Sequence, residues 1–291
     1  MVKLEYVSAR GDVLPLTENP LFNLTHVDGQ TTAGPSIASA VLGGVDGDIV
    51  NNIQAVPRTI ILDLQIKSGV NVEEAKREIL KVVKIKQQGG LIWTQNERTV
   101  VIAGYVETVD MPRWTNATVM QITLHCEQPF WEDVYDVIQQ INEKINLHYF
   151  TDNPRNMLYF PVDGIALGAY DTIRTKQFYN NGDVAVGIEI TILALETVTN
   201  PIIYDMAGNF FGIGHGTGNK KFVMKSGEFA TIKTHKGNKT VTMNGVNLFD
   251  KIRPLSTWLQ LAAGDNQFTI NSDEDSTDNM SFSLIYKQRY I

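Results

Sequence analysis

The sequence predicts a mainly β protein with one main helix, divided into two domains. Of its 291 residues, 43% are hydrophobic and 20% are charged, which is typical of folded globular chains and argues against disordered or collagen-like ones. Several segments alternate apolar and polar residues, and turn dipeptides such as Asp28-Gly29, Asp46-Gly47 and Asn244-Gly245 separate them. At roughly 150 residues per domain, the length predicts two domains, with one large β-rich domain as the alternative.

Four segments have the two-residue period of a half-buried strand. In residues 59–67, one face carries Ile60, Leu62, Leu64 and Ile66, whereas the other carries mostly polar side chains. The same alternation recurs in residues 119–127, 184–192 and 280–286. The acidic run 273–278, just before the last of these, is expected to be a hairpin tip between two closing strands.

One segment has the pattern of a helix. Apolar residues in residues 71–88 recur at the i, i+3, i+4 spacing of one helix face. Asn71 is a favourable N-cap, and Gly89-Gly90 is expected to end the helix. Residues 134–145 fit either a helical stripe or a strand rich in β-branched residues, and the sequence leaves the choice open.

The domain boundary is expected after Pro129-Phe130-Trp131, which gives domains of residues 1–132 and 133–291. The polar break at residues 151–155 is the alternative boundary. The first domain would contain strands, the helix and further strands, and the second would be almost entirely β.

Charge and cysteine content exclude several classes of protein. The formal net charge of −7 provides no broad basic field to hold phosphates, so general nucleic-acid binding is disfavoured. The single cysteine, Cys126, excludes an intrachain disulfide framework and a cysteine-rich zinc site. No secretion signal is recognised, and no apolar run approaches the roughly 20 residues of a membrane-spanning helix.

Motifs for catalysis or cofactor binding are not found. The Gly-rich stretch 208–218 has neither dinucleotide-binding nor P-loop spacing and is interpreted as a loop between strands. Cys126 lies on the apolar face of its strand, where a small buried hydrophobe is the simpler interpretation. The histidines show no metal-ligand spacing: His26, His125, His148, His215 and His235. We therefore expect a non-enzymatic protein with no catalytic, cofactor-binding or metal-binding residue.

The tryptophans leave a binding hypothesis open. Trp93, Trp114, Trp131 and Trp258 could stack on sugars, although aromatic residues more often fill cores and subunit interfaces. Trp258 is the candidate sugar or partner contact. A carbohydrate-binding protein that uses a C-terminal β-sandwich for host-surface attachment is thus one functional alternative, and a wall-degrading hydrolase is another.

The order of features resembles that of siphophage distal tail proteins (Dit). In the first half, the helix and Leu91-Ile92-Trp93 precede a long strand that closes on Pro129-Phe130-Trp131. In the second half, the matching elements follow in order: Phe160-Pro161, Leu167-Gly168, residues 179–184, Ile188-Glu189-Ile190, Asn200-Pro201, Ser226-Gly227-Glu228, residues 240–245, residues 258–261 and residues 264–266. The resemblance covers nearly the whole chain.

The resemblance implies a structural protein of the virion tail tip, made in the cytoplasm of a host bacterium and encoded by a phage or prophage. It implies an N-terminal tail-tube-like β domain that forms a hexameric ring, and a C-terminal galectin-like β-sandwich. The ring would be a baseplate hub that joins the tail tube protein to a tail-associated lysin and to receptor-binding proteins. It would contact no membrane and no specific nucleic-acid sequence, although DNA would pass through its channel.

A ring made by head-to-tail contacts requires apolar surface that a monomer leaves exposed. Ile61 and Val101 stand opposite the apolar faces of their strands, and we predict that a neighbouring subunit covers them. The net negative charge also suits a DNA conduit, because a basic lining would hold the passing phosphates.

Overall fold

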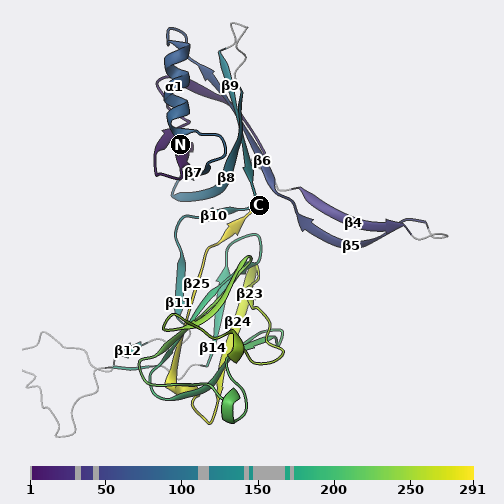
Figure 1. Cartoon of the computed structure of the whole chain (residues 1–291), viewed down its shortest axis with the longest axis vertical. Coiled ribbons are helices and arrows are strands. Elements are labelled where there is room, and N and C mark those ends of the chain that lie inside the picture. The colour runs from purple at the N-terminus through teal and green to yellow at the C-terminus, as the bar shows by residue number, and fades with distance from the viewer. Residues whose placement is uncertain are drawn as a thin grey trace, which may run out of the picture. The chain divides into compact units, whose positions relative to one another are not determined.

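The computed structural model describes residues 2–29, 34–41, 46–110, 118–140, 144–146, 168–170 and 174–291. These residues are mostly β-strand, and they include one α-helix, which confirms the predicted fold class. The chain divides into two compact units (Figure 1). The first comprises Met1–Tyr135 with Arg289–Ile291, and the second comprises Asp136–Gln288, so the division lies close to the predicted boundary after residue 132.

A nine-stranded antiparallel sheet forms most of the first unit. Its main path is β2-β1-β7-β8-β9-β6-β3, and β10 pairs with both β8 and β26. The C-terminal residues thereby return to the first unit, where Trp131 lies opposite Tyr290. The strands are β1 (Val2–Ser8), β2 (Val13–Pro15), β3 (Phe22–Asp28), β6 (Arg58–Ile66), β7 (Gln88–Gln95), β8 (Arg98–Asp110), β9 (Val119–Cys126), β10 (Trp131–Asp133) and β26 (Arg289–Tyr290).

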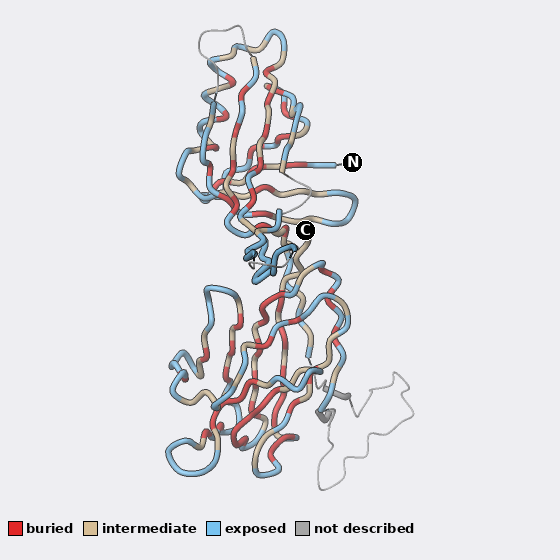
Figure 2. The backbone as a smooth tube through the Cα atoms, turned by 90° about the vertical axis from the view of Figure 1, so that its right-hand side faces the viewer, coloured by how far each residue is buried: buried red, intermediate tan, exposed pale blue. Residues whose placement is uncertain are grey.

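Helix α1 (Val72–Val82) packs on the apolar face of this sheet. The side chain of Asn71 accepts hydrogen bonds from the backbone N–H groups of Glu73 and Glu74, which caps the helix as predicted. Ala75 and Ile79 are buried on its inner side, in one core cluster with the apolar residues of β6 and β9. The alternation of buried and accessible residues along the strands is visible in Figure 2.

The predicted end of the helix was wrong, because the helix stops at Val82 instead of continuing to residue 88. Val83 is already extended, with φ −89° and ψ 109°, and its side chain is fully buried in the core. Gly89 and Gly90 lie within β7. A Cβ atom at Gly89 would lie 2.3 Å from the hydroxyl of Tyr6, so this glycine permits close packing of β7 against the ring instead of ending a helix.

A two-stranded hairpin of the first unit lies in the sequence between β3 and β6 and projects from the nine-stranded sheet (Figure 1). Its strands, β4 (Pro35–Val41) and β5 (Asp48–Ala55), pair only with each other. Nearly every residue in them is exposed. We refer to residues 35–41 and 48–55 as the β4–β5 hairpin.

Two antiparallel sheets enclose the core of the second unit. One contains β11 (Val137–Gln140), β16 (Glu189–Ala194), β20 (Phe229–His235), β21 (Asn238–Met243), β22 (Val246–Asn247) and β25 (Met280–Tyr286). The other contains β14 (Thr175–Asn180), β17 (Val198–Asp205), β18 (Phe210–Gly212), β19 (Val223–Met224) and β24 (Gly264–Asp273). Two further pairs are β12 (Lys144–Asn146) with β13 (Gly168–Tyr170), and β15 (Val186–Gly187) with β23 (Gln260–Leu261).

In this unit the structure decides one open choice of the sequence analysis and corrects one prediction. Within residues 134–145, the described parts are strands β11 and β12, which resolves the open choice in favour of β structure. The acidic run 273–278 is not a hairpin tip, because β24 and β25 belong to different sheets. It is the connection from one sheet to the other, and it includes a 3₁₀ turn at Thr277–Asn279.

Candidate functional site

The predicted ring contacts Ile61 and Val101 lie on the face of the first sheet that points away from α1. Both side chains are half-buried. Ile61 lies opposite Thr123 of β9, whereas Val101 lies opposite Ile92 of β7 and Glu132 of β10. The two residues therefore share a face but do not form one cluster.

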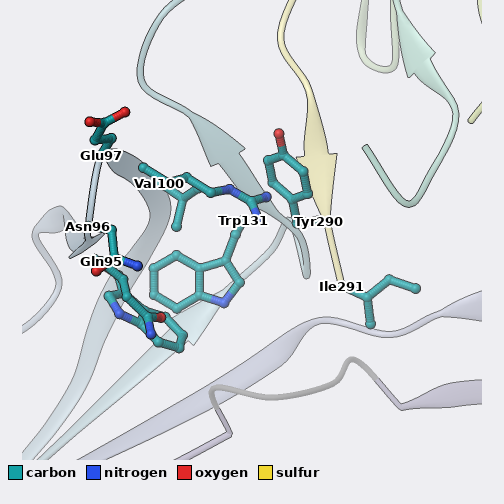
Figure 3. Close-up of a pocket in the computed structure, with 9 residues that line it drawn as sticks. Gln95, Asn96, Glu97, Val100, Trp131, Tyr290 and Ile291 are labelled. Carbon is teal, nitrogen blue, oxygen red and sulfur yellow. The ribbon is translucent and has the colours of Figure 1, made fainter. Parts of the chain in front are cut away.

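A pocket of about 590 Å³ opens at the end of the same unit, where the β7–β8 turn meets β10 and β26 (Figure 3). Two indole rings form its apolar part: the centroids of Trp93 and Trp131 are 5.8 Å apart, with the rings near-perpendicular at 75°. The pocket lining consists of Trp93, Gln95, Asn96, Glu97, Arg98, Val100, Trp131, Tyr290 and Ile291. We refer to these residues as the Trp93–Trp131 pocket.

Charged and hydroxyl groups interact with one another at the rim of this pocket. The guanidinium carbon of Arg98 lies 3.4 Å from the ring centroid of Tyr290, a cation–π contact, and the Tyr290 hydroxyl donates a 3.0 Å hydrogen bond to Asp133. Burial, and then this hydrogen bond, raise the pKa of Tyr290 to about 12. Arg289 donates to the carboxylate of Glu132 at 2.7 Å, which ties β26 to β10. The rim is thus built by segments about 160 residues apart in the sequence, because each of these two hydrogen bonds joins residues separated by 157 positions.

One polar group in the pocket has no partner. The indole N–H of Trp93 is buried and makes no hydrogen bond within the described residues. A buried donor left unpaired costs roughly 1–3 kcal/mol.

Trp258 of the second unit is partly buried against the core. Its ring centroid lies 5.0 Å from that of Phe211 and 5.9 Å from that of Phe249, and the ammonium of Lys239 lies 5.4 Å from it. Phe249 is 45% exposed. Trp258 therefore joins a small aromatic cluster that reaches the surface at Phe249.

A buried polar cluster lies behind the Gly-rich stretch 208–218. Asn200 is fully buried with φ 48°, and its amide donates to Asp273 at 2.8 Å while its carbonyl oxygen accepts from the backbone of Phe222. Gly214 packs so closely that a Cβ there would lie 2.3 Å from the Asn200 oxygen. The stretch interpreted as a loop thus includes strand β18 and a packed turn.

The other candidate groups are scattered. Among the described residues, no three metal-ligating side chains come together. Cys126 is buried, and burial raises the pKa of its thiol to about 11, so the thiolate needed for nucleophilic attack is disfavoured. In the described part of the chain no helix has the length and apolar content to span a membrane. Trp114, His148, residues 151–155 and Phe160-Pro161 lie outside the described residues.

Comparisons with known proteins support the Dit resemblance. Residues 181–290 match the family model of the siphovirus-type tail component, C-terminal domain. The whole chain superposes on the crystal structure of phage SPP1 Dit (gp 19.1), a protein of the hub adsorption apparatus of phages that infect Gram-positive bacteria. That match has a TM-score of 0.66 and 11% identity, and it covers 100% of both chains.

A weaker match is to the phage P2 baseplate, with a TM-score of 0.48, 13% identity, and coverage of 99% of this chain and 98% of that chain. No curated protein matches the sequence. Residues 181–290 thus resemble the siphovirus-type tail component domain, and the chain as a whole has the fold of SPP1 Dit.

Sequence reasoning missed two surface features of the first unit. The β4–β5 hairpin lacks a clean alternation because a β-bulge falls between Ala38 and Ser39. The pocket depends on the pairing of β10 with β26, which no local pattern indicates. The Asp46-Gly47 dipeptide, which lies between the two strands, is the sequence feature that indicates the hairpin, because this type of dipeptide favours tight turns.

Proposed function

We propose that this protein is a Dit-like structural component of a phage tail tip, where six copies form the ring of the hub. The whole-chain likeness to SPP1 Dit carries the proposal, because both units occur in that fold in the same order. The family match of the second unit supports it independently, since it rests on sequence alone.

The first unit would build the ring. Ile61 and Val101 lie half-buried on the sheet face that points away from α1, and a neighbouring copy would bury them further. Ring contacts of this kind join two different surfaces of adjacent copies, so each copy contributes both surfaces and the ring closes without free ends.

The second unit would contact the other tail proteins. We infer that the ring joins the tail tube protein to a tail-associated lysin and to receptor-binding proteins. Trp258, with the exposed Phe249 beside it, is our candidate for a partner contact, because aromatic clusters that reach the surface are frequent in interfaces. On this proposal the protein itself is not an enzyme.

Native mass spectrometry of the purified protein tests the assembly. Six copies of the 32.5 kDa chain have a mass of about 195 kDa, and we expect this species to dominate at micromolar concentration. Replacing Ile61 or Val101 by Lys should shift the population to smaller species, whereas Val246→Lys, at an exposed site of the second unit, should not. Full-size rings from both the Ile61 and Val101 variants would contradict this assignment of the interface.

A further inference from the structure

The β4–β5 hairpin and the Trp93–Trp131 pocket are two unpartnered surfaces of the same unit. We propose that the hairpin of one copy seats in the pocket of the next copy and thereby links adjacent subunits of the ring. This inference rests on the proposed ring function and names a contact that holds the ring together.

The hairpin carries an apolar face that only a partner would cover. Across the ladder Ile37 pairs with Ile53, and the bulge after Ala38 brings Val50 and Val41 to the same face. These four side chains are between 49% and 81% exposed. Together they present on the order of 400 Å² of apolar surface, the size of patch that marks an interaction site.

The hairpin carries little of the charge that protects a free strand pair. A two-stranded ribbon is at best marginally stable in water, and exposed edges are commonly protected by charged side chains, Pro or bulges. Residues 35–41 and 48–55 contain Pro35 and one bulge, but their only ionisable residue is Asp48. Such a segment is expected to be stabilised by docking on another chain.

The pocket has the complementary properties. Two indole rings, those of Trp93 and Trp131, form part of its lining. An incoming hairpin would supply the apolar side chains that such a surface accommodates. The hairpin does not line the pocket of its own chain.

One charged group of the pocket rim, Arg98, is complementary to the hairpin. The only ionisable side chains from residue 46 to residue 55 are the carboxylates of Asp46 and Asp48. Arg98 at the pocket rim forms no ion pair among the described residues, because its guanidinium lies over Tyr290. Glu97 also lines the pocket, but its carboxylate points away from the indole of Trp131 (Figure 3).

A contact of this kind is the type that rings require. The hairpin and the pocket are different surfaces, so the contact between them is heterologous, and copies joined by a heterologous contact form a ring when the rotation from one copy to the next closes. With seven or eight residues per strand, the hairpin reaches roughly 25 Å, enough to extend to an adjacent domain.

Site-specific photo-crosslinking of the full chain tests the proposal. We would place p-benzoylphenylalanine at Ile53, on the apolar face, and in a matched control at Ile49, which is on the opposite face of the hairpin and similarly exposed, at 53% against 63%. The protein would be an equal mixture of unlabelled and ¹⁵N-labelled copies, so that mass spectrometry separates links between copies from links within one copy.

We expect links between copies from position 53 to peptides that contain residues 93–100, 131 or 290, at least about fivefold more abundant than from position 49. In the unmodified sequence, Ile53→Asp should raise the concentration needed for ring formation about tenfold or more, and Ile49→Asp should change it little.

Three results would overturn the proposal. Rings that form while position 53 links to another surface of the neighbour would refute this contact and leave the ring function standing. Links within one copy only would place the hairpin on its own chain. An absence of rings at native mass spectrometry, also after mixing with the cognate tail tube protein, and with no link between copies, would refute the ring function and this contact together.

Discussion

The alkaline stability of the first unit is expected to depend on Cys126. This thiol is 1% exposed, and burial raises its pKa from 9.0 to about 11, although the nearby Arg58 guanidinium acts in the opposite direction. A pKa that is higher in the folded state favours the protonated form there. The stabilisation is therefore fully present below pH 9 and is lost as the pH rises towards 11.

The magnitude follows from the two pKa values. Relative to neutral pH, titration of this thiol should lower the free energy of unfolding by about 1 kcal/mol at pH 10 and by about 2 kcal/mol at pH 11. Cys126→Ala removes the titrating group and leaves a small cavity. Its cost should be about 1 kcal/mol at neutral pH and should not grow with pH.

The assay is urea unfolding of both proteins at pH 7 to 11, together with hydrogen exchange of the β9 amides, which reports on the first unit alone. Other groups that titrate in this range are common to both proteins and cancel in the difference. We expect the difference in unfolding free energy between the wild type and Cys126→Ala, which favours the wild type at neutral pH, to disappear between pH 9 and 11. Parallel curves of unfolding free energy against pH for the two proteins over that range would contradict a raised pKa of Cys126.

Three further changes should alter stability in defined ways. Gly104→Ala should destabilise the first unit by about 2 kcal/mol, because its Cβ would lie 2.9 Å from a backbone carbonyl of β9; a thermal melt that is unchanged would contradict this close packing. Asn200→Asp should be more destabilising at pH 8 than at pH 4, since a buried carboxylate would face Asp273 across 2.8 Å, and equal loss at both values would disprove a charge effect. The wild type should lose stability between pH 10 and 12, because the pKa of the Tyr290 phenol, which donates a hydrogen bond to Asp133, is raised in the folded state, and Tyr290→Phe should abolish this loss. Urea unfolding of both proteins from pH 10 to 12 measures the effect. The same dependence of unfolding free energy on pH in both proteins would contradict the prediction.

Local patterns predicted the strands well. The alternation of Ile60, Leu62 and Leu64 corresponds to fully buried positions of β6, because period-two patterning depends only on which face meets the core. The N-cap at Asn71 was predicted for a similarly local reason. The end of the helix was not predicted correctly, because Gly89 does not end a helix but packs against the ring of Tyr6 on the neighbouring strand β1.

Features that depend on distant segments were missed. The pairing of Trp131 with Tyr290 brings a segment near the middle of the sequence together with its last residues, and neither neighbourhood carries a signal for the other. The same holds for the acidic run 273–278, whose two flanking strands join different sheets. Surface sites assembled from such segments, including the pocket at Trp93, require the structure.

Two-dimensional averaging of electron micrographs of the purified protein tests whether six copies form a ring. We expect closed rings with sixfold symmetry and an open channel, at the mass of about 195 kDa expected for six 32.5 kDa chains. Monomers at every concentration, also after mixing with the cognate tail tube protein, would contradict it.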